Sequence, residues 1–193
     1  MKQVVPKNFK NKVKKVKKIK TFEEKQQIKK FLKDRYGQKY GTSKLERDFA
    51  IDFLDANGID YVYQYEAKDI GRWFDFAIAV DKRKYIKENK DGLNSIKQDD
   101  PSFEVSFLIE VDGSYFHSDP RIVDEKKMNS MQKHNKFVDK IKDTYAAINC
   151  IPLVRFWEED IRKHPEKVME ELKKYIKISD KKHRILENKK KPH

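Results

Sequence analysis

The stretch that decides the fold is Phe107-Leu108-Ile109-Glu110-Val111-Asp112-Gly113. Its apolar residues form a short continuous run that ends at a glycine, which predicts a buried β-strand over 103–111. Glu110 and Asp112 interrupt the run, and side chains two residues apart in a strand point to the same face. Burying a carboxylate is costly unless it has a partner or binds a metal ion. The stretch therefore predicts a strand with functional acids at its end.

A second apolar run, Trp73 to Val80, predicts another strand with a single charged residue inside it, Asp75. If the two strands are neighbours, Asp75 can face Glu110 and Asp112. Such a group of oxygen atoms suits a hard cation such as Mg²⁺. In a simpler interpretation, each carboxylate forms an ion pair with a cationic side chain. The candidate partners are Arg72, Arg121, Arg155 or a lysine.

Upstream of these strands, the pattern predicts a helix and a strand. Helical spacing runs over 43–57 and ends at Asn57-Gly58, a good C-terminal capping pair. Alternating Tyr and Val residues over 61–65 predict a strand. Residues 81–102 are polar and contain Asp91-Gly92, so we expect an excursion or a long hairpin loop there.

Downstream, a helix predicted over 124–148 leads to a strand predicted over 151–156. A strand, a long helix and a second strand in this order predict a right-handed parallel crossover. Pro165 fits the first turn of a last helix, and a loose basic tail is expected from Asp180. The whole order predicts an α/β fold with a small mixed central sheet flanked by helices.

His117 follows Asp112 closely and is the one histidine beside the acidic strand end. A histidine titrates near neutral pH, so it can accept or donate a proton during catalysis. The alternative is an ordinary histidine in a surface loop. Next to a predicted metal site the catalytic interpretation is favoured. The spacing of the histidines and of the single cysteine matches no structural zinc site.

Charge is unevenly divided along the chain. Residues 1–40 carry a net charge of +12, residues 41–160 one of −6 and residues 161–193 one of +7, within a total of +13. Basic ends neutralise phosphates and release counterions, which predicts that they bind nucleic acid. Alternatively, the ends are solvated tails that only aid solubility. The candidate nucleic-acid-binding lysines are Lys14, Lys15, Lys17, Lys18 and Lys20 in the N-terminal arm, with Lys126 and Lys127 in the central region.

Composition excludes some classes of protein, and the distribution of charge divides the chain into three regions. No stretch approaches the roughly 18 consecutive apolar residues of a membrane span, so no membrane partner is expected. One cysteine permits no internal disulfide, and lysines rather than an apolar run follow Met1, which favours the cytoplasm. We expect a basic nucleic-acid-binding arm and helix over 1–40, a core over 41–161, and a C-terminal helix and basic tail over 162–193.

The ordered motifs resemble the PD-(D/E)XK nuclease superfamily over roughly residues 43–161. The resemblance is to the EDxHD branch, which includes the very-short-patch repair endonuclease and phage homing endonucleases. The motifs that carry it are Ser43-Lys44-Leu45-Glu46, Arg72-Trp73-Phe74-Asp75-Phe76, Glu110-Val111-Asp112-Gly113, His117, Asp139 and Val154-Arg155-Phe156-Trp157. This resemblance implies a nuclease-like α/β core and a metal-dependent DNA endonuclease of the homing or a similar site-specific type.

The resemblance also implies roles for single residues. Glu46, Asp75, His117 and Asp139 would be catalytic, with Asp124 a competing candidate for the last of these. The metal ion would be Mg²⁺, with Mn²⁺ as an alternative. Its candidate ligands are Asp75, Glu110, Asp112 and the backbone carbonyl of Val111. The substrate would be double-stranded DNA, bound by a monomer or a homodimer.

One position departs from the superfamily pattern. Asp112 stands where the motif has a lysine, so the lysine's role is vacant or is taken by His117, Lys126 or Lys127. This leaves other functions open. They are a non-catalytic nucleic-acid-binding protein on the same fold, a mismatch-repair or restriction endonuclease, and a basic RNA-associated protein.

Overall fold

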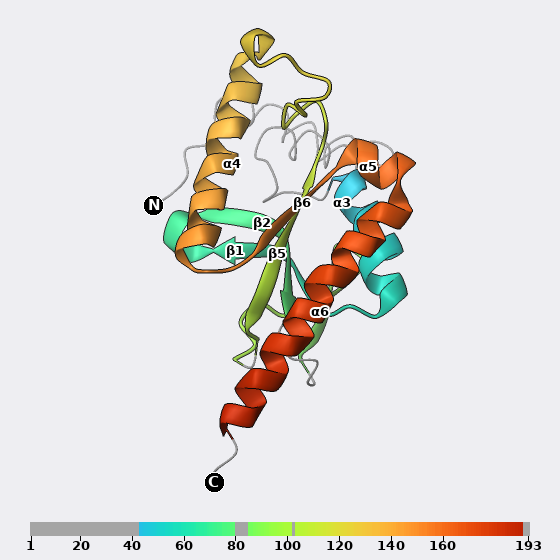
Figure 1. Ribbon diagram of the computed structural model, residues 1–193, viewed down its shortest axis with the longest axis vertical. Helices are drawn as coiled ribbons and strands as arrows, with labels where there is room; N and C mark the ends of the chain where they lie inside the picture. Colours follow the sequence, from blue (N-terminus) through green and yellow to red (C-terminus); the bar gives the residue numbers. More distant parts are fainter. Residues whose placement is uncertain (1–42, 80–84, 102, 191–193) are drawn as a thin grey trace, which may run out of the picture. The chain divides into compact units, whose positions relative to one another are not determined.

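The structure is a computed structural model that describes residues 43–79, 85–101 and 103–190, with side chains described up to 181. The chain divides into two units, Met1–Ser43 and Lys44–His193. The second unit contains nearly all of the described residues, and its main helices and strands are labelled in Figure 1. The predicted N-terminal arm and its lysines, Lys14 to Lys20, lie outside the described residues.

A four-stranded mixed sheet forms the centre of the fold. Its strands are β1 (Tyr61–Ala67), β2 (Arg72–Ala79), β5 (Val105–Asp112) and β6 (Leu153–Trp157). They lie in the order β1-β2-β5-β6, antiparallel except for the parallel pair β5 and β6. The helix α4 (Ser130–Ile148) connects this parallel pair, as predicted. The small mixed sheet with flanking helices is therefore confirmed.

One face of the sheet is covered by the helices at the two ends of this unit (Figure 1). The chain enters through α3 (Lys44–Phe49), which continues as a π-helical turn over Ala50–Leu54 and a 3₁₀ turn over Asp55–Asn57. Gly58 then ends the segment in the left-handed conformation, with φ of 62°, which confirms the predicted cap. Phe49 is fully buried, and its ring packs against Phe76 and Phe156 on the sheet.

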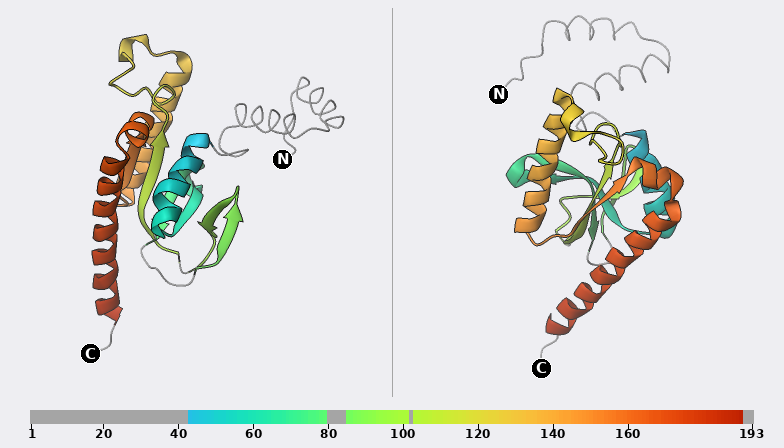
Figure 2. Two further views of the ribbon diagram at one scale, coloured as in Figure 1. Left: turned by 90° about the vertical axis from the view of Figure 1, so that its right-hand side faces the viewer. Right: turned by 45° about the horizontal axis from the view of Figure 1, so that its top comes forward.

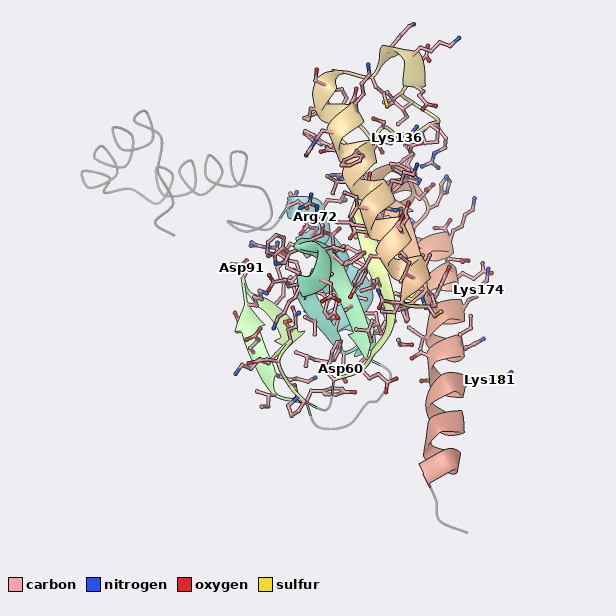
Figure 3. All side chains as sticks on the ribbon, turned by 90° about the vertical axis from the view of Figure 1, so that its left-hand side faces the viewer. Asp60, Arg72, Asp91, Lys136, Lys174 and Lys181 are labelled. Carbon is pink, nitrogen blue, oxygen red and sulfur yellow. The ribbon has the colours of Figure 1, made fainter. Side chains whose placement is uncertain are left out.

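The last helices complete this layer. After β6 the chain forms α5 (Glu158–Lys163) and α6 (Pro165–Lys190), and α6 buries Val168 and Leu172 in the core. The predicted loose tail from Asp180 is wrong, because α6 continues to Lys190. No proline or glycine lies between Glu166 and Lys190, and lysine and glutamate are good helix formers. Lys174 and Lys181 lie at successive positions along α6 (Figure 3).

The opposite face is covered by α4, which packs Ala146 and Tyr145 against the sheet (Figure 2). This helix begins later than predicted. Asn129 and Gln132 form a reciprocal capping box at its start, and only a short 3₁₀ turn, Glu125–Lys127, precedes it. The capping box satisfies free backbone amides, so it fixes where the helix begins.

A small hairpin occupies the polar segment after β2. Its strands are β3 (Lys87–Lys90) and β4 (Leu93–Ile96), joined by Asp91-Gly92, which lies at the tip (Figure 3). Both turn residues have positive φ, as the tightest hairpin turns require. Ser95 of β4 accepts a hydrogen bond from the Tyr63 amide at 2.9 Å, which ties the hairpin to β1. No helix in the described part of the chain is long and apolar enough to cross a membrane.

The core packing of α6 gives the first prediction. Leu172 is fully buried, so Leu172→Ala removes apolar contacts and should lower the free energy of unfolding by about 2–5 kcal/mol. Lys177→Ala, on the exposed side of the same helix, should change it by less than about 0.5 kcal/mol. Urea unfolding measures both, and equal effects of the two variants would show that α6 is not packed on the sheet.

Candidate active site

Asp75 lies where β2 and β5 stop pairing. The ladder joins Phe76 to Ile109, the neighbours of Asp75 and Glu110. Beyond that pair, the Asp75 carboxylate accepts a hydrogen bond from the Val111 amide at 2.7 Å. A side chain thus replaces a backbone partner at the point where the strands separate. As predicted, the acids of the two strands lie together, and Asp75 is almost fully buried.

Glu110 has a lysine partner, as the ion-pair interpretation allowed, although the sequence analysis did not identify which lysine. Lys142 reaches in from α4, and its Nζ donates a hydrogen bond to Glu110 Oε2 at 2.7 Å. Both side chains are buried, and the Lys142 ammonium also lies 5.5 Å from the centre of the Phe74 ring. The other oxygen of Glu110, Oε1, has no hydrogen-bond partner among the residues that the structure describes. One oxygen of a buried carboxylate is therefore left to bind a ligand.

A signal for Lys142 was present in the helix pattern. Val138, Tyr145 and Ala146 lie on the side of α4 that faces the sheet. Residues three or four apart share a helix face, so Lys142 falls on the same stripe. A lysine on an apolar stripe needs a buried acid opposite it.

Burial dominates the ionisation of this group. Loss of hydration, together with the negative charges of Glu110 and Glu46, raises the pKa of Asp75 well above its usual range. Burial also raises the pKa of Glu110, although the nearby charge of Lys142 works in the opposite direction. Burial lowers the pKa of Lys142, but the charges of Glu110 and Asp75 outweigh it and the pKa is raised. The group therefore carries more acid than its one lysine neutralises.

Glu46 belongs to the same electrostatic group. It is buried on α3 and accepts a hydrogen bond from the hydroxyl of Tyr63 at 3.0 Å. Its charge contributes to the raised pKa of Asp75, so the first helix brings a third carboxylate towards the strand acids. Glu46 therefore lies close enough to Asp75 for their charges to interact.

His117 and Asp139 form a second group. His117 Nδ1 lies 3.0 Å from Asp139 Oδ2 and 3.5 Å from Asp112 Oδ1. Burial lowers the pKa of His117, but the hydrogen bond to Asp139 and the charges of Asp112 and Asp139 outweigh it, so the pKa is raised. Since Nδ1 faces the acids, Nε2 is the ring nitrogen left for a substrate or a water molecule.

Arg155 on β6 balances the acids of this second group. Its Nη1 donates hydrogen bonds to both oxygens of Asp112, at 2.9 and 3.1 Å, and lies 3.5 Å from Asp139 Oδ1. Asp112, His117 and Asp139 each offer an atom within 4.8 Å of the others, close enough for a metal ion. However, Arg155 already supplies a positive charge to both carboxylates. Asp112 is therefore in an ion pair with Arg155, as the simpler interpretation of the sequence allowed.

Three other candidates lie away from both groups. Asp124 is the N-terminal cap of the 3₁₀ turn and accepts a hydrogen bond from the Lys126 amide at 3.0 Å. Lys126 and Lys127 are exposed on this turn. Between Asp139 and Asp124, only Asp139 contacts His117 in the described structure. Lys142, and not Lys126 or Lys127, is the lysine that contacts a strand acid in the described structure.

No family model, curated protein or solved structure matches this chain. What the protein does is therefore inferred from its own side chains. They combine a buried acid pair with a lysine, and a histidine held by an aspartate.

The raised pKa of Asp75 predicts a pH-dependent stability. The folded protein holds this proton more tightly than the unfolded chain, so the stabilisation is complete below about pH 4 and is lost as the pH rises through the folded pKa. Asp75→Asn keeps an oxygen for the Val111 amide but removes the charge. We expect the variant to melt several degrees higher than wild type at pH 8 in EDTA, and by less at pH 5. A lower melting temperature at pH 8 would contradict a costly buried charge.

The buried ion pair gives a second prediction. Lys142→Met leaves Glu110 without its counter-charge and should lower the free energy of unfolding by about 3–5 kcal/mol. The double variant Lys142→Met/Glu110→Gln should recover most of this loss, because no buried charge remains. Lys140→Met, on the exposed side of α4, is the control. A loss of stability in the double variant as large as in Lys142→Met would show that the ion pair is not the cause.

Proposed function

We propose that this protein is a metal-dependent DNA endonuclease that hydrolyses phosphodiester bonds. The observation that carries the proposal is the pairing of two groups at one end of the sheet. Asp75 and Glu110 supply buried carboxylates, and His117 with Asp139 supplies an oriented proton carrier. Asp112, which follows Glu110 on β5 by two residues, lies 3.5 Å from His117 and joins the groups.

The donor atoms fit Mg²⁺, with Mn²⁺ as the alternative. Hard divalent cations prefer carboxylate oxygens, and Glu110 Oε1 is buried without a hydrogen-bond partner among the described residues. Asp75 and Glu110 would hold the ion. Asp112 is a weaker candidate ligand, because Arg155 occupies both of its oxygens. When bound, the ion supplies Lewis-acid chemistry, polarising the phosphate and acidifying a water molecule.

The side chains around this pair have separate tasks. Lys142 keeps one positive charge beside Glu110, which reduces repulsion between the acids and an incoming phosphate. Asp139 fixes the ring of His117 through Nδ1, so that Nε2 can exchange a proton with the reacting atoms. The hydrogen bond to Asp139 and the charges of the nearby acids raise the pKa of His117, so its ring stays protonated to higher pH than that of an isolated histidine. The protonated ring suits a proton donor or a stabiliser of phosphate charge, and the neutral ring suits a base.

DNA binding is assigned to the parts of the chain with a positive net charge. The central region is acidic, so it repels the phosphate backbone unless the ends and a cation compensate. Beside the site, Tyr115 and Phe116 are more than half exposed and immediately precede His117. Exposed aromatic rings can stack on bases, which is consistent with a nucleic-acid substrate.

A second candidate is a non-catalytic DNA-binding protein on the same fold. The observation that favours it is the internal charge compensation of the site. Lys142 and Arg155 already pair with Glu110 and Asp112, so these acids are stable without a metal ion. This alternative shares the basic ends and predicts DNA binding without cleavage.

Cleavage of plasmid DNA tests the proposal. The wild-type protein should cut with Mg²⁺ and not with EDTA, and Asp75→Ala or His117→Ala should lower the cleavage rate by at least about 100-fold. Both variants should bind DNA nearly as well as wild type, because the basic ends are unchanged. His134→Ala, an exposed histidine on α4, should cleave normally.

The outcomes separate the two candidates. Normal cleavage by both Asp75→Ala and His117→Ala would contradict the site. Tight DNA binding by the wild-type protein, with no cleavage in Mg²⁺ or Mn²⁺, would favour the non-catalytic alternative.

A further inference from the structure

The loop between β5 and α4 carries His117 and is held from the α4 side. Gln132 Nε2 donates a hydrogen bond to the carbonyl of Tyr115 at 2.8 Å. Asn135 Nδ2 donates one to the carbonyl of Phe116 at 3.0 Å. These contacts fix the two residues before His117.

The residues after His117 are in a less favourable conformation. Ser118 has φ of 58°, in the left-handed region that costs a residue with a side chain about 1 kcal/mol or more. Asp119 follows and is completely buried. Its amide donates to the carbonyl of Ser114 at 2.9 Å, and its carbonyl accepts from the Ile122 amide at 2.9 Å. An unfavourable φ persists only where neighbouring contacts hold it, so the contacts of Asp119 matter for Ser118 and His117.

Arg121 connects this buried acid to another element. Its Nε lies 3.0 Å from Asp119 Oδ1, and its Nη2 lies 2.7 Å from Asp119 Oδ2. Its Nη1 and Nη2 also donate to the two oxygens of Asp160 on α5, at 2.8 and 3.0 Å. The guanidinium thus binds two carboxylates, one in the loop and one on α5. We call Asp119, Arg121 and Asp160 the clamp.

We infer that the clamp positions His117 against Asp139. This inference rests on the proposed function, in which His117 exchanges a proton with the substrate. Without the clamp, Ser118 can relax to a more favourable φ, and the 3.0 Å contact between His117 and Asp139 is then lost. A lysine cannot replace Arg121, because its single ammonium lacks the planar fork that binds two carboxylates at once.

Arg121→Lys in the full chain tests this role while keeping the charge. Amide protons of residues 114–123 should exchange about tenfold faster, since local opening becomes easier, while those of β5 stay unchanged. Cleavage should lose about tenfold in kcat, with KM for DNA within about twofold, because misplaced groups affect the chemical step. Arg162→Lys is the matched control, since Arg162 pairs only with Glu158 of its own helix in the described structure.

Two readouts do not depend on cleavage. Hydrogen exchange of the loop and the NMR signal of the His117 Nδ1 proton, shared with Asp139, report the geometry directly. If the wild-type protein does not cut DNA, the proposed function fails while these readouts still decide the clamp. Asp160→Asn changes the partly buried end of the clamp. It should shift both readouts in the same direction as Arg121→Lys but by less, and it is a second test in case Arg121→Lys misfolds. Loop exchange and a His117 signal equal to wild type in both variants would overturn the inference.

Discussion

The structure depends on how a negative charge is buried on an inner strand of the sheet. Glu110 lies on an inner strand, where its charge cannot be hydrated, and Lys142 enters from α4 to neutralise it. This one requirement fixes several others. It sets the rotation of α4, places Asp139 on the side of that helix that meets His117, and brings Asp143 to Arg155. The positions of the functional side chains thus follow from an electrostatic need of the core.

Local patterns predicted the strands, the cap at Gly58 and the parallel pair joined by α4, because each depends on neighbouring residues. They also indicated that Asp75 can face Glu110 if the two strands are neighbours, and the pairing of β2 with β5 meets that condition. Lys142 was missed because its partner is distant in the sequence, and a lysine in a helix usually faces solvent. The pairing of Asp112 with Arg155 was one of several open alternatives. The register of β5 and β6 places Arg155 opposite Glu110, and the long side chain of Arg155 reaches Asp112. The length of α6 was underestimated because charge was taken as a sign of disorder, although the same residues favour helix.

The two groups of the site differ in what they cost the fold. In the group around His117, Arg155 forms ion pairs with both Asp112 and Asp139, so each of these carboxylates has a cationic partner. Asp75 and Glu110 share one lysine, and burial raises the pKa of both carboxyl groups. Ionising both acids is therefore a cost to stability that a bound cation or proton removes. The group around His117 and the pair of Asp75 and Glu110 meet at Asp112. Under the proposed function, the ion pairs of the first group hold the side chains in place for chemistry at the second.

The length of the last helix, α6, can be compared with the helical repeat of DNA. The 26 residues of α6 make a rod of about 39 Å, at roughly 1.5 Å per residue. One turn of B-DNA repeats at about 34 Å, so a duplex lying along this rod would present a full helical turn to it. Under the proposed function, a helix of this length can touch the same DNA strand at two points one turn apart. The C-terminal extension would then span one full repeat of the phosphate backbone.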